Sequence, residues 1–255
     1  MPTRTPPFDE ASIDPATIKG VFFDLGGTLF TYHGMPGRSG ELLVTAAQQM
    51  NIEAPPEAIG KAYQEANRRV AVEYGQKAYY LHADLFRDVF VQFCNALGGK
   101  FDDQIWDAYR LNHDAAVIEA LAIRTECTAT MKALRAKGLY LSIASNIDHQ
   151  MLQALVERDG LDLLFNDWTS SEEAKSCKPD GAFFDYTREK SGLEMGNVLF
   201  VGDSPEHDIL GAHRAGMKTA LLAEPGIVAP LQSGKKTVAP DCKIDALSDL
   251  LEILT

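Results

Sequence analysis

A short apolar run that stops at a carboxylate constrains the fold of this chain more than any other stretch. Val21, Phe22 and Phe23 are bulky, and Asp24, two glycines and a threonine follow soon after. Such a run, short and closed by a turn signal, is typical of a strand buried on both faces of a parallel sheet. Open α/β sheets bind their ligands beyond the carboxyl ends of such strands. Asp24 therefore lies where a ligand site is expected.

Strands and helices alternate over the second half of the chain. The pattern predicts strands at 20–24, 139–145, 163–165, 197–202 and 218–222, and helices at 128–137, 150–158, 182–191, 208–215 and 246–251. Alternation of this kind indicates right-handed βαβ units and a parallel sheet. The fold class we expect is α/β, a doubly wound parallel sheet.

Residues 41–114 interrupt this alternation with a block of helices. Apolar side chains recur there at helical spacing, Pro55 and Pro56 mark a helix start, and Gly98 and Gly99 mark an end. Several helices with short links indicate a small bundle inserted between the first two strands. We therefore expect a leader at 1–19, a core domain at 20–36 and 120–255, and a helical domain at 37–119.

Composition excludes several classes of protein. The formal net charge of −12 disfavours a nucleic-acid or anionic-membrane partner, because either surface would repel the chain. Apolar runs fall short of the ~20 residues that a membrane span needs, and the first ten residues lack the apolar core of a secretory signal. The four cysteines are widely spaced. We expect reduced thiols in a cytoplasmic protein.

Further polar groups follow the later apolar runs. Ser145 and Asn146 end one predicted strand, Lys178 lies in a loop before a helix, and Asp203 and Asp208 follow another strand. Parallel strands would bring these groups to one edge of the sheet. Clustered carboxylates need a cation, and oxygen ligands suit Mg²⁺. A lysine and a hydroxyl suit the oxygens of a phosphoryl group.

These residues resemble a known family. Asp24-Leu25-Gly26-Gly27-Thr28, Ser145-Asn146, Lys178-Pro179 and Gly202-Asp203 with Asp208 are similar to the four motifs of the haloacid dehalogenase-like hydrolase superfamily, in that order. The resemblance extends from residue 20 to the end. It implies a Rossmann-like core and a helical cap of the family's first type.

The resemblance also implies roles for single residues. Asp24 would attack phosphorus and form an aspartyl-phosphate, with Ser145 and Lys178 as its catalytic partners. Mg²⁺ would be held by Asp24, the backbone carbonyl of Gly26 and Asp203, with Asp208 as a ligand or directly behind one. Phosphoryl oxygens would be bound by the backbone of Leu25 and Gly26, by Ser145, by the backbone N–H of Asn146, and by Lys178.

Gly26 departs from the family's pattern. Most phosphatases of the family carry an aspartate there as general acid and base, and dehalogenases usually carry an aromatic residue. Loss of a positioned acid-base group costs about 10²–10⁴-fold in rate. His33, His149 and His207 lie near the motifs and are candidates to replace the missing acid.

The function we expect is Mg²⁺-dependent removal of a phosphoryl group from a small phosphorylated metabolite, by a monomer or homodimer. The alternatives are phosphonate or 2-haloacid hydrolysis, and a non-enzymatic module that binds a phospho-ligand or a protein. The phosphonate chemistry would need a cap lysine, and Lys61 and Lys77 are available. Candidates for substrate specificity in the helical region are Arg68, Arg69, Lys77, Tyr79, Tyr80, His82 and Arg87.

Overall fold

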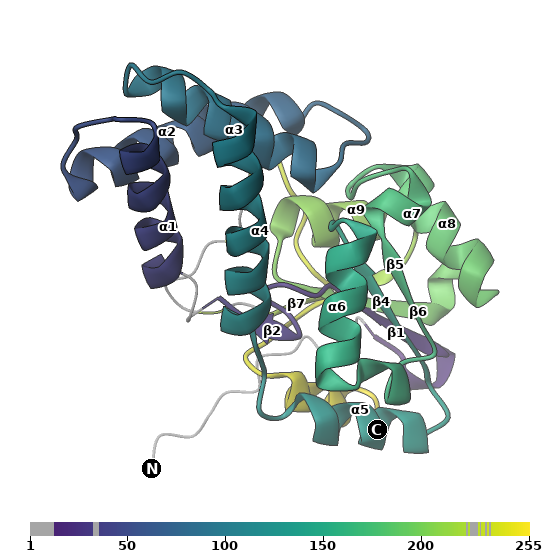
Figure 1. The fold of residues 1–255 in the computed structure, drawn as a ribbon. Coiled ribbons are helices and arrows are strands. Elements are labelled where there is room, and N and C mark those ends of the chain that lie inside the picture. The colour runs from purple at the N-terminus through teal and green to yellow at the C-terminus, as the bar shows by residue number, and fades with distance from the viewer. Residues whose placement is uncertain are drawn as a thin grey trace, which may run out of the picture.

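A six-stranded parallel sheet forms the centre of the protein (Figure 1). The computed structural model describes residues 13–32, 36–222, 224, 229, 231–232, 234 and 236–255. The strand order is β5-β4-β1-β6-β7-β8, and each neighbouring pair is parallel. The bounds are β1 Gly20–Phe23, β4 Tyr140–Ser145, β5 Asp167–Ser170, β6 Val198–Gly202, β7 Lys218–Leu222 and β8 Cys242–Ile244. This confirms the predicted doubly wound α/β fold.

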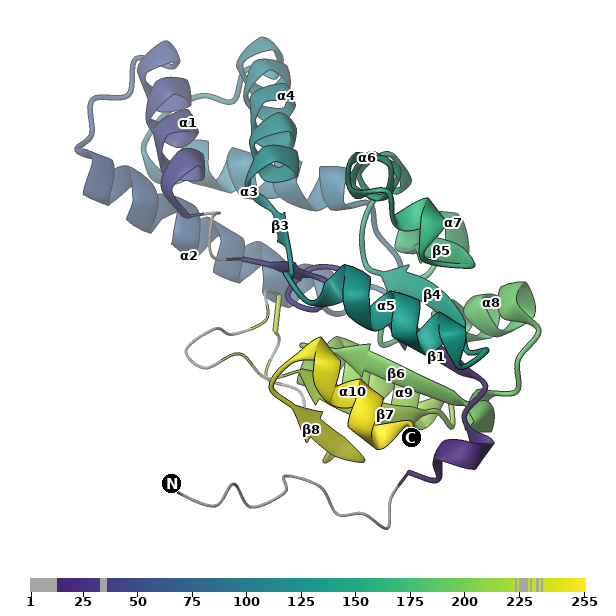
Figure 2. The same ribbon diagram turned by 90° about the horizontal axis from the view of Figure 1, so that it is seen from below.

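Helices cover both faces of the sheet. Val21 and Phe23 of β1 pack toward α5 (Cys127–Ala136), α6 (His149–Asp159) and α10 (Leu250–Ile253). Phe22 points to the opposite face, toward α8 (Gly181–Ser191) and α9 (Leu210–Arg214). Figure 2 shows α5 and α10 side by side on their face. Because both faces are covered, β1 is apolar at every position, as a doubly buried strand must be.

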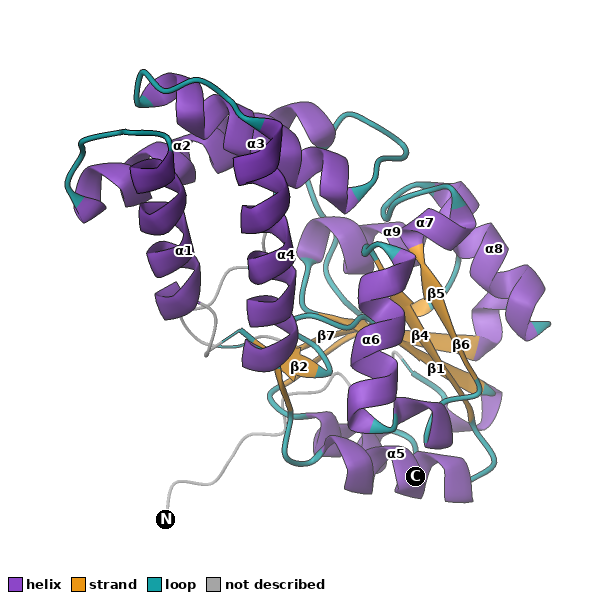
Figure 3. Cartoon of the chain, viewed as in Figure 1, coloured by secondary structure: helices purple, strands orange, loops and turns teal. Residues whose placement is uncertain are grey.

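The inserted region consists of α1 (Pro36–Gln49), α2 (Pro56–Tyr74), α3 (His82–Ala96) and α4 (Asp103–Ala120). Its helices lie together, apart from the strands of the sheet (Figure 3). They have a hydrophobic cluster of their own, in which the ring of Phe90 contacts those of Phe93, Trp106 and Tyr109. Within the described residues, every helix is too short or too polar to span a bilayer.

Two short strands join the helical region to the sheet. β2 (Phe30–Thr31) and β3 (Ala122–Ile123) pair antiparallel, so the chain leaves and re-enters the core at adjacent points. The alternation of apolar residues did not predict this ribbon, because two-residue strands carry no period. The division at residues 37 and 119 remains a prediction.

One predicted strand was wrong. Residues 161–163 form a 3₁₀ turn, and the strand lies later, at Asp167–Ser170. The apolar Leu164 and Phe165 anchor the turn in the core instead of lying in the sheet. The true strand is polar because it is an edge strand next to β4, where the Asp167 carboxylate accepts hydrogen bonds from Ser142 and Tyr140.

The remaining elements are short. They are the 3₁₀ turns Pro15–Thr17, Met195–Asn197 and Leu247–Asp249, the π-helical turn Pro205–Ile209, and α7 (Ser171–Ala174). The π-helical turn and α9 together replace the single helix predicted at 208–215. Strand β8 was not predicted at all.

Candidate active site

The carboxyl ends of three neighbouring strands bring the motif residues together. β1 lies between β4 and β6, with Phe23 opposite both Ile143 and Val201. Asp24 directly follows β1, and Ser145 is the last residue of β4. This is the point at which the chain switches from one side of β1 to the other, where open α/β sheets place their ligands.

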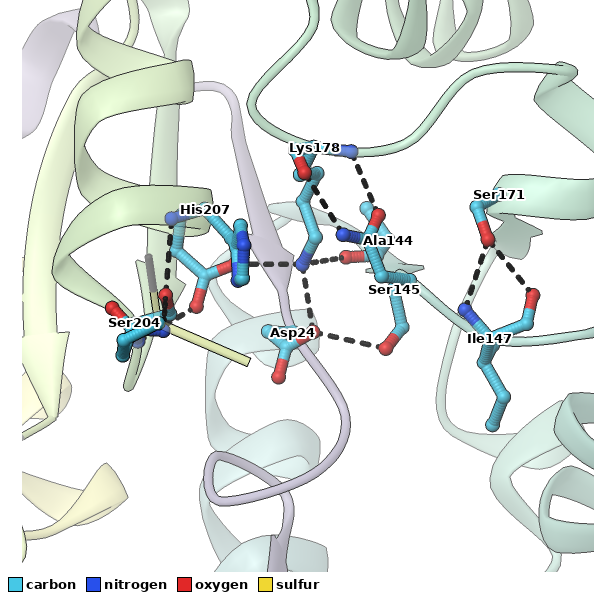
Figure 4. Close-up of polar contacts among 11 residues, drawn as sticks. Asp24, Ala144, Ser145, Ile147, Ser171, Lys178, Ser204 and His207 are labelled. Atoms are coloured by element: carbon cyan, nitrogen blue, oxygen red, sulfur yellow. Dashed lines mark hydrogen bonds and ion pairs between the residues drawn. The ribbon is translucent and has the colours of Figure 1, made fainter. Parts of the chain in front are cut away.

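Asp24 is held by two hydrogen bonds to the same oxygen. Ser145 Oγ donates to Asp24 Oδ1 at 2.9 Å, and Lys178 Nζ donates to it at 2.7 Å. Lys178 also donates to Asp208 Oδ1 at 2.7 Å and to the carbonyl of Ala144 at 2.8 Å. Figure 4 shows the ammonium group at the centre of these contacts. All three of its protons therefore have protein acceptors.

The charge of Lys178 survives its burial. The residue is 3% exposed, and burial alone would lower its pKa. The charges of Asp208 and Asp24, with their hydrogen bonds, outweigh burial and raise the pKa above its ordinary value. A fixed positive charge is thus built in beside Asp24.

Three carboxylates gather at this edge of the sheet. Oxygen atoms of Asp24, Asp203 and Asp208 lie within 4.8 Å of one another. Burial, then the charges of Asp24 and Asp208, raises the pKa of Asp203 to about 9. Burial is also the main reason that the pKa of Asp208 rises to about 6. A set of hard oxygen donors that repel one another fits a divalent cation such as Mg²⁺.

Glycines allow the backbone to approach these carboxylates. Gly27 has φ +79°, and a Cβ there would lie 2.1 Å from Asp203 Oδ2. A Cβ on Gly202 would lie 2.3 Å from Asp208 Oδ2. Any larger residue at either position would displace a candidate ligand, which explains why the motifs need glycine there.

Asn146 and Asp208 hold the loops of the site in place. The side chain of Asn146 donates to the carbonyl of Lys178 at 2.9 Å and accepts from its backbone N–H at 2.7 Å. Asp208 Oδ2 accepts from the backbone N–H of Ser204 at 2.9 Å. The side chain of Asn146 therefore positions Lys178, a task separate from the backbone role implied by the resemblance.

Two supporting residues were not predicted from the sequence. Arg124 donates to the carbonyls of Gly27 and Thr28, each at 2.8 Å, and so fixes the loop after Asp24. Ser171 Oγ donates to the carbonyl of Ile147 and accepts from its N–H, each at 3.1 Å. Neither residue belongs to a motif, and no signal in the sequence distinguished them from surface side chains.

The remaining candidates make contacts of their own. The His149 ring is near Ser170 Oγ at 3.4 Å, and the backbone N–H of His207 donates to Ser204 Oγ at 3.0 Å. His33 lies outside the described residues. The side chain of Leu25 is buried in the core. In the helical region, Arg68 and Arg69 pair with Glu65, Arg87 pairs with Asp103, and Lys77 lies over the ring of Tyr74.

The helical region touches the core beside the site. The carbonyl of Ala78 accepts from the backbone N–H of Cys177 at 2.8 Å, and Cys177 immediately precedes Lys178. A cleft of about 590 Å³, lined in part by Lys77, Cys177 and Arg214, lies at this contact; none of the three aspartates is among its lining residues. Burial raises the pKa of the Cys177 thiol, and the opposing effect of Lys178 is smaller.

The chain is similar in sequence to known proteins. The family model of the haloacid dehalogenase-like hydrolases matches residues 18–216. The chain is 28% identical to the pyrimidine 5'-nucleotidase YjjG of Escherichia coli, over 92% of this chain and 96% of that protein. It is 26% identical to an (S)-2-haloacid dehalogenase of Pseudomonas sp. strain YL, over 92% of this chain and 94% of that protein.

A solved structure agrees with the fold. The magnesium-bound structure of YfnB from Bacillus subtilis, described as a HAD-hydrolase, superposes with a TM-score of 0.70 at 20% identity, covering 93% of this chain and 98% of that one. The matching family model, the parallel sheet and the inserted helices lead to one conclusion. The chain belongs to the haloacid dehalogenase-like hydrolase family.

Proposed function

We propose that the protein is a Mg²⁺-dependent phosphatase that acts on a small phosphorylated metabolite, with Asp24 as the nucleophile. The observation that carries this proposal is the environment of Asp24, which is held by Lys178 and Ser145 beside Asp203 and Asp208. Phosphoryl transfer needs a positioned nucleophile and fixed positive charge around the phosphoryl oxygens. The site combines both.

These contacts support a reaction in two steps. An oxygen of Asp24 attacks phosphorus, the bond to the leaving group breaks, and water later hydrolyses the aspartyl-phosphate. The negative charge on Asp24 is lost as its oxygen bonds to phosphorus. The protons of Lys178 and Ser145 that point at Asp24 then turn to the phosphoryl oxygens. In this way Lys178, whose protons all have protein acceptors at first, can bind the phosphoryl group once the negative charge moves from Asp24 to the phosphoryl oxygens.

Asp24, Asp203 and the backbone carbonyl of Gly26 would hold the metal. Both oxygens of Asp208 already accept hydrogen bonds, one from Lys178 and one from Ser204. We therefore assign Asp208 to the positioning of Lys178 and of the loop after β6. When bound, Mg²⁺ supplies positive charge that offsets the repulsion between Asp24 and an anionic substrate.

A screen of phosphate esters tests the proposal. The panel contains p-nitrophenyl phosphate, sugar phosphates and nucleoside monophosphates, the last because one relative is a pyrimidine 5'-nucleotidase. We expect release of inorganic phosphate with Mg²⁺ and none in EDTA. Asp203→Asn should need much more Mg²⁺ for the same rate.

The same preparation distinguishes the alternatives. Halide release from 2-chloropropionate without Mg²⁺ would indicate a dehalogenase, the activity named for another relative. The cluster of three carboxylates argues against that outcome. Without a bound metal, its negative charge would repel the anionic 2-chloropropionate. Binding of phosphate esters with no turnover would indicate a binding module.

A further inference from the structure

The chain lacks a carboxyl group at position 26, and a tyrosine hydroxyl stands close to where that group would be. Tyr32 follows β2, six residues beyond Gly26. A Cβ built on Gly26 would lie 2.6 Å from Tyr32 Oη. In an aspartate the carboxylate oxygens lie about 2.4 Å from Cβ by standard bond lengths. The hydroxyl therefore lies at the distance at which an aspartate at position 26 would present its oxygens.

The ring of Tyr32 also lies against the next glycine. A Cβ on Gly27 would be 2.8 Å from Tyr32 Cε2, and the same point is 2.1 Å from Asp203 Oδ2. The ring edge and the Asp203 carboxylate thus flank one backbone position. The structure shows no hydrogen bond from the Tyr32 hydroxyl to another described residue, so this donor is available to a ligand.

The phenol of Tyr32 lies close to the acidic groups of the candidate metal site. Burial, and then the charges of Asp203, Asp24 and Asp208, raises the pKa of Tyr32 well above its ordinary value. The three carboxylates that raise it are those of the candidate metal site. The Tyr32 side chain therefore lies beside the proposed metal site, next to Gly26 and Gly27.

We propose that the Tyr32 hydroxyl is the catalytic proton donor that takes the place of the aspartate missing at position 26. The inference rests on the proposed phosphatase function. As the Asp24 oxygen bonds to phosphorus, the bond from phosphorus to the leaving oxygen breaks, and that oxygen takes the proton of Tyr32. In the second step, water attacks the aspartyl-phosphate and gives a proton back to the phenolate, so the protein is regenerated.

A series of leaving groups tests the assignment. Aryl phosphates leave without a proton, whereas alkyl phosphates need one. Tyr32→Phe keeps the ring and removes the hydroxyl. We expect kcat/KM to fall by about 10²–10³-fold for alkyl phosphates and by less than about tenfold for p-nitrophenyl phosphate. A plot of log(kcat/KM) against leaving-group pKa should become steeper. A merely structural role would lower all substrates equally.

A matched control is Tyr186→Phe on α8, which removes a hydroxyl that donates to Glu173 at 3.0 Å and belongs to none of the four motifs. This variant should keep the wild-type slope. If the wild type releases phosphate from the esters and Tyr32→Phe has the same slope, the tyrosine assignment is overturned and the phosphatase stands. If the wild type releases phosphate from no ester, the proposed function fails, and the assignment fails with it.

A rescue experiment adds an independent criterion. Gly26→Asp alone should gain nothing on alkyl phosphates, because its Cβ would meet Tyr32 Oη. Gly26→Asp combined with Tyr32→Ser vacates the space and restores a carboxyl group. For alkyl phosphates, we expect kcat/KM of the double variant to be at least about tenfold higher than kcat/KM of Tyr32→Phe. A full gain by Gly26→Asp with Tyr32 intact would show that the tyrosine does not occupy this place.

Discussion

Asp24 is the residue on which the proposed chemistry depends most directly. Asp24→Asn keeps an oxygen that can accept from Ser145 and Lys178, but an amide does not attack phosphorus. We expect turnover to fall by about 10⁴-fold or more, as for loss of other nucleophiles. Thermal melting should show a folded protein, since the size of the side chain is unchanged. Phosphatase activity equal to that of the wild type would remove Asp24 from the mechanism.

The acidic cluster predicts a pH dependence of stability. The raised pKa values of Asp203, about 9, and Asp208, about 6, mean that folding favours their protonated forms. Without metal, the free energy of unfolding should therefore fall as the pH rises from about 4 through these values. Mg²⁺ binds the charged carboxylates and should reverse this loss. The increase in Tm caused by Mg²⁺ should be larger near about pH 8.5 than near about pH 5.5.

Melting curves in EDTA and in Mg²⁺ at the two pH values check this prediction. Asp203→Asn removes the group with the higher pKa, so it should raise the Tm of the metal-free protein at alkaline pH and weaken the response to Mg²⁺. An increase in Tm of the same size at both pH values would contradict a metal held by these carboxylates.

Sequence alone predicted the residues of the site that end apolar runs. Asp24 and Asp203 directly follow apolar strands, and Ser145 is the last residue of one. The hydrophobicity of these strands can be recognised in the sequence, and the sheet brings their carboxyl ends together. Tyr32 and Arg124 do not end a predicted strand, so the sequence pattern did not identify them. Their places depend on how the loop after Asp24 folds back, which no local period encodes.

At the scale of elements, α3 begins without a capping side chain of its own. Its N-cap residue is Leu81, and the first N–H groups, those of His82 and Ala83, instead donate to the Asp148 carboxylate at 2.7 and 2.8 Å. Asp148 belongs to the core, three residues after Ser145. It therefore joins the helical region to the loop that carries a proposed phosphate ligand.

Asp148→Ala should lower the free energy of unfolding by about 0.5–2 kcal/mol, the usual effect of losing an N-cap. It should also raise KM, because the helical region is then less firmly held over the site. Asp102→Ala is the matched control, since Asp102 caps α4 locally by accepting from the N–H of Ile105. Urea unfolding should show a similar loss for both variants, and only Asp148→Ala should change KM. Equal KM values would mean that this contact does not affect substrate binding.

Elements that carry an apolar pattern of their own could be predicted from the sequence. Helices α2 and α3 have long apolar stripes. The predicted start of α2 at Pro55 and Pro56 and the predicted end of α3 at Gly98 and Gly99 lie close to the observed bounds. Strands β5 and β8 are short and partly polar, because each lies at an edge of the sheet. Their stability comes from pairing with a neighbour rather than from their own sequence, so periodicity did not identify them.

At the scale of the whole molecule, we expect the β2–β3 ribbon to mark where the helical region can be removed. Thr31 lies opposite Ala122, so an Asn-Gly turn in place of residues 32–121 would close a two-residue hairpin. The sheet and the cluster on the side of α8 do not involve the deleted residues. We therefore expect a folded core with a parallel sheet. Its Tm should be lower, because Leu121 and partly buried residues of α4 pack against the core.

The shortened protein should retain weak, Mg²⁺-dependent hydrolysis of p-nitrophenyl phosphate, because Asp24, Lys178 and Asp203 all remain. It should lose discrimination among substrates and almost all activity on alkyl phosphates, since Tyr32 and the cap are gone. The control deletes residues 32–122 with the same turn, which shifts the ribbon by one residue and turns its side chains to the wrong faces. Circular dichroism and melting should show that the in-register deletion is the more stable. Equal stability would mean that the ribbon does not set the boundary between the helical region and the core.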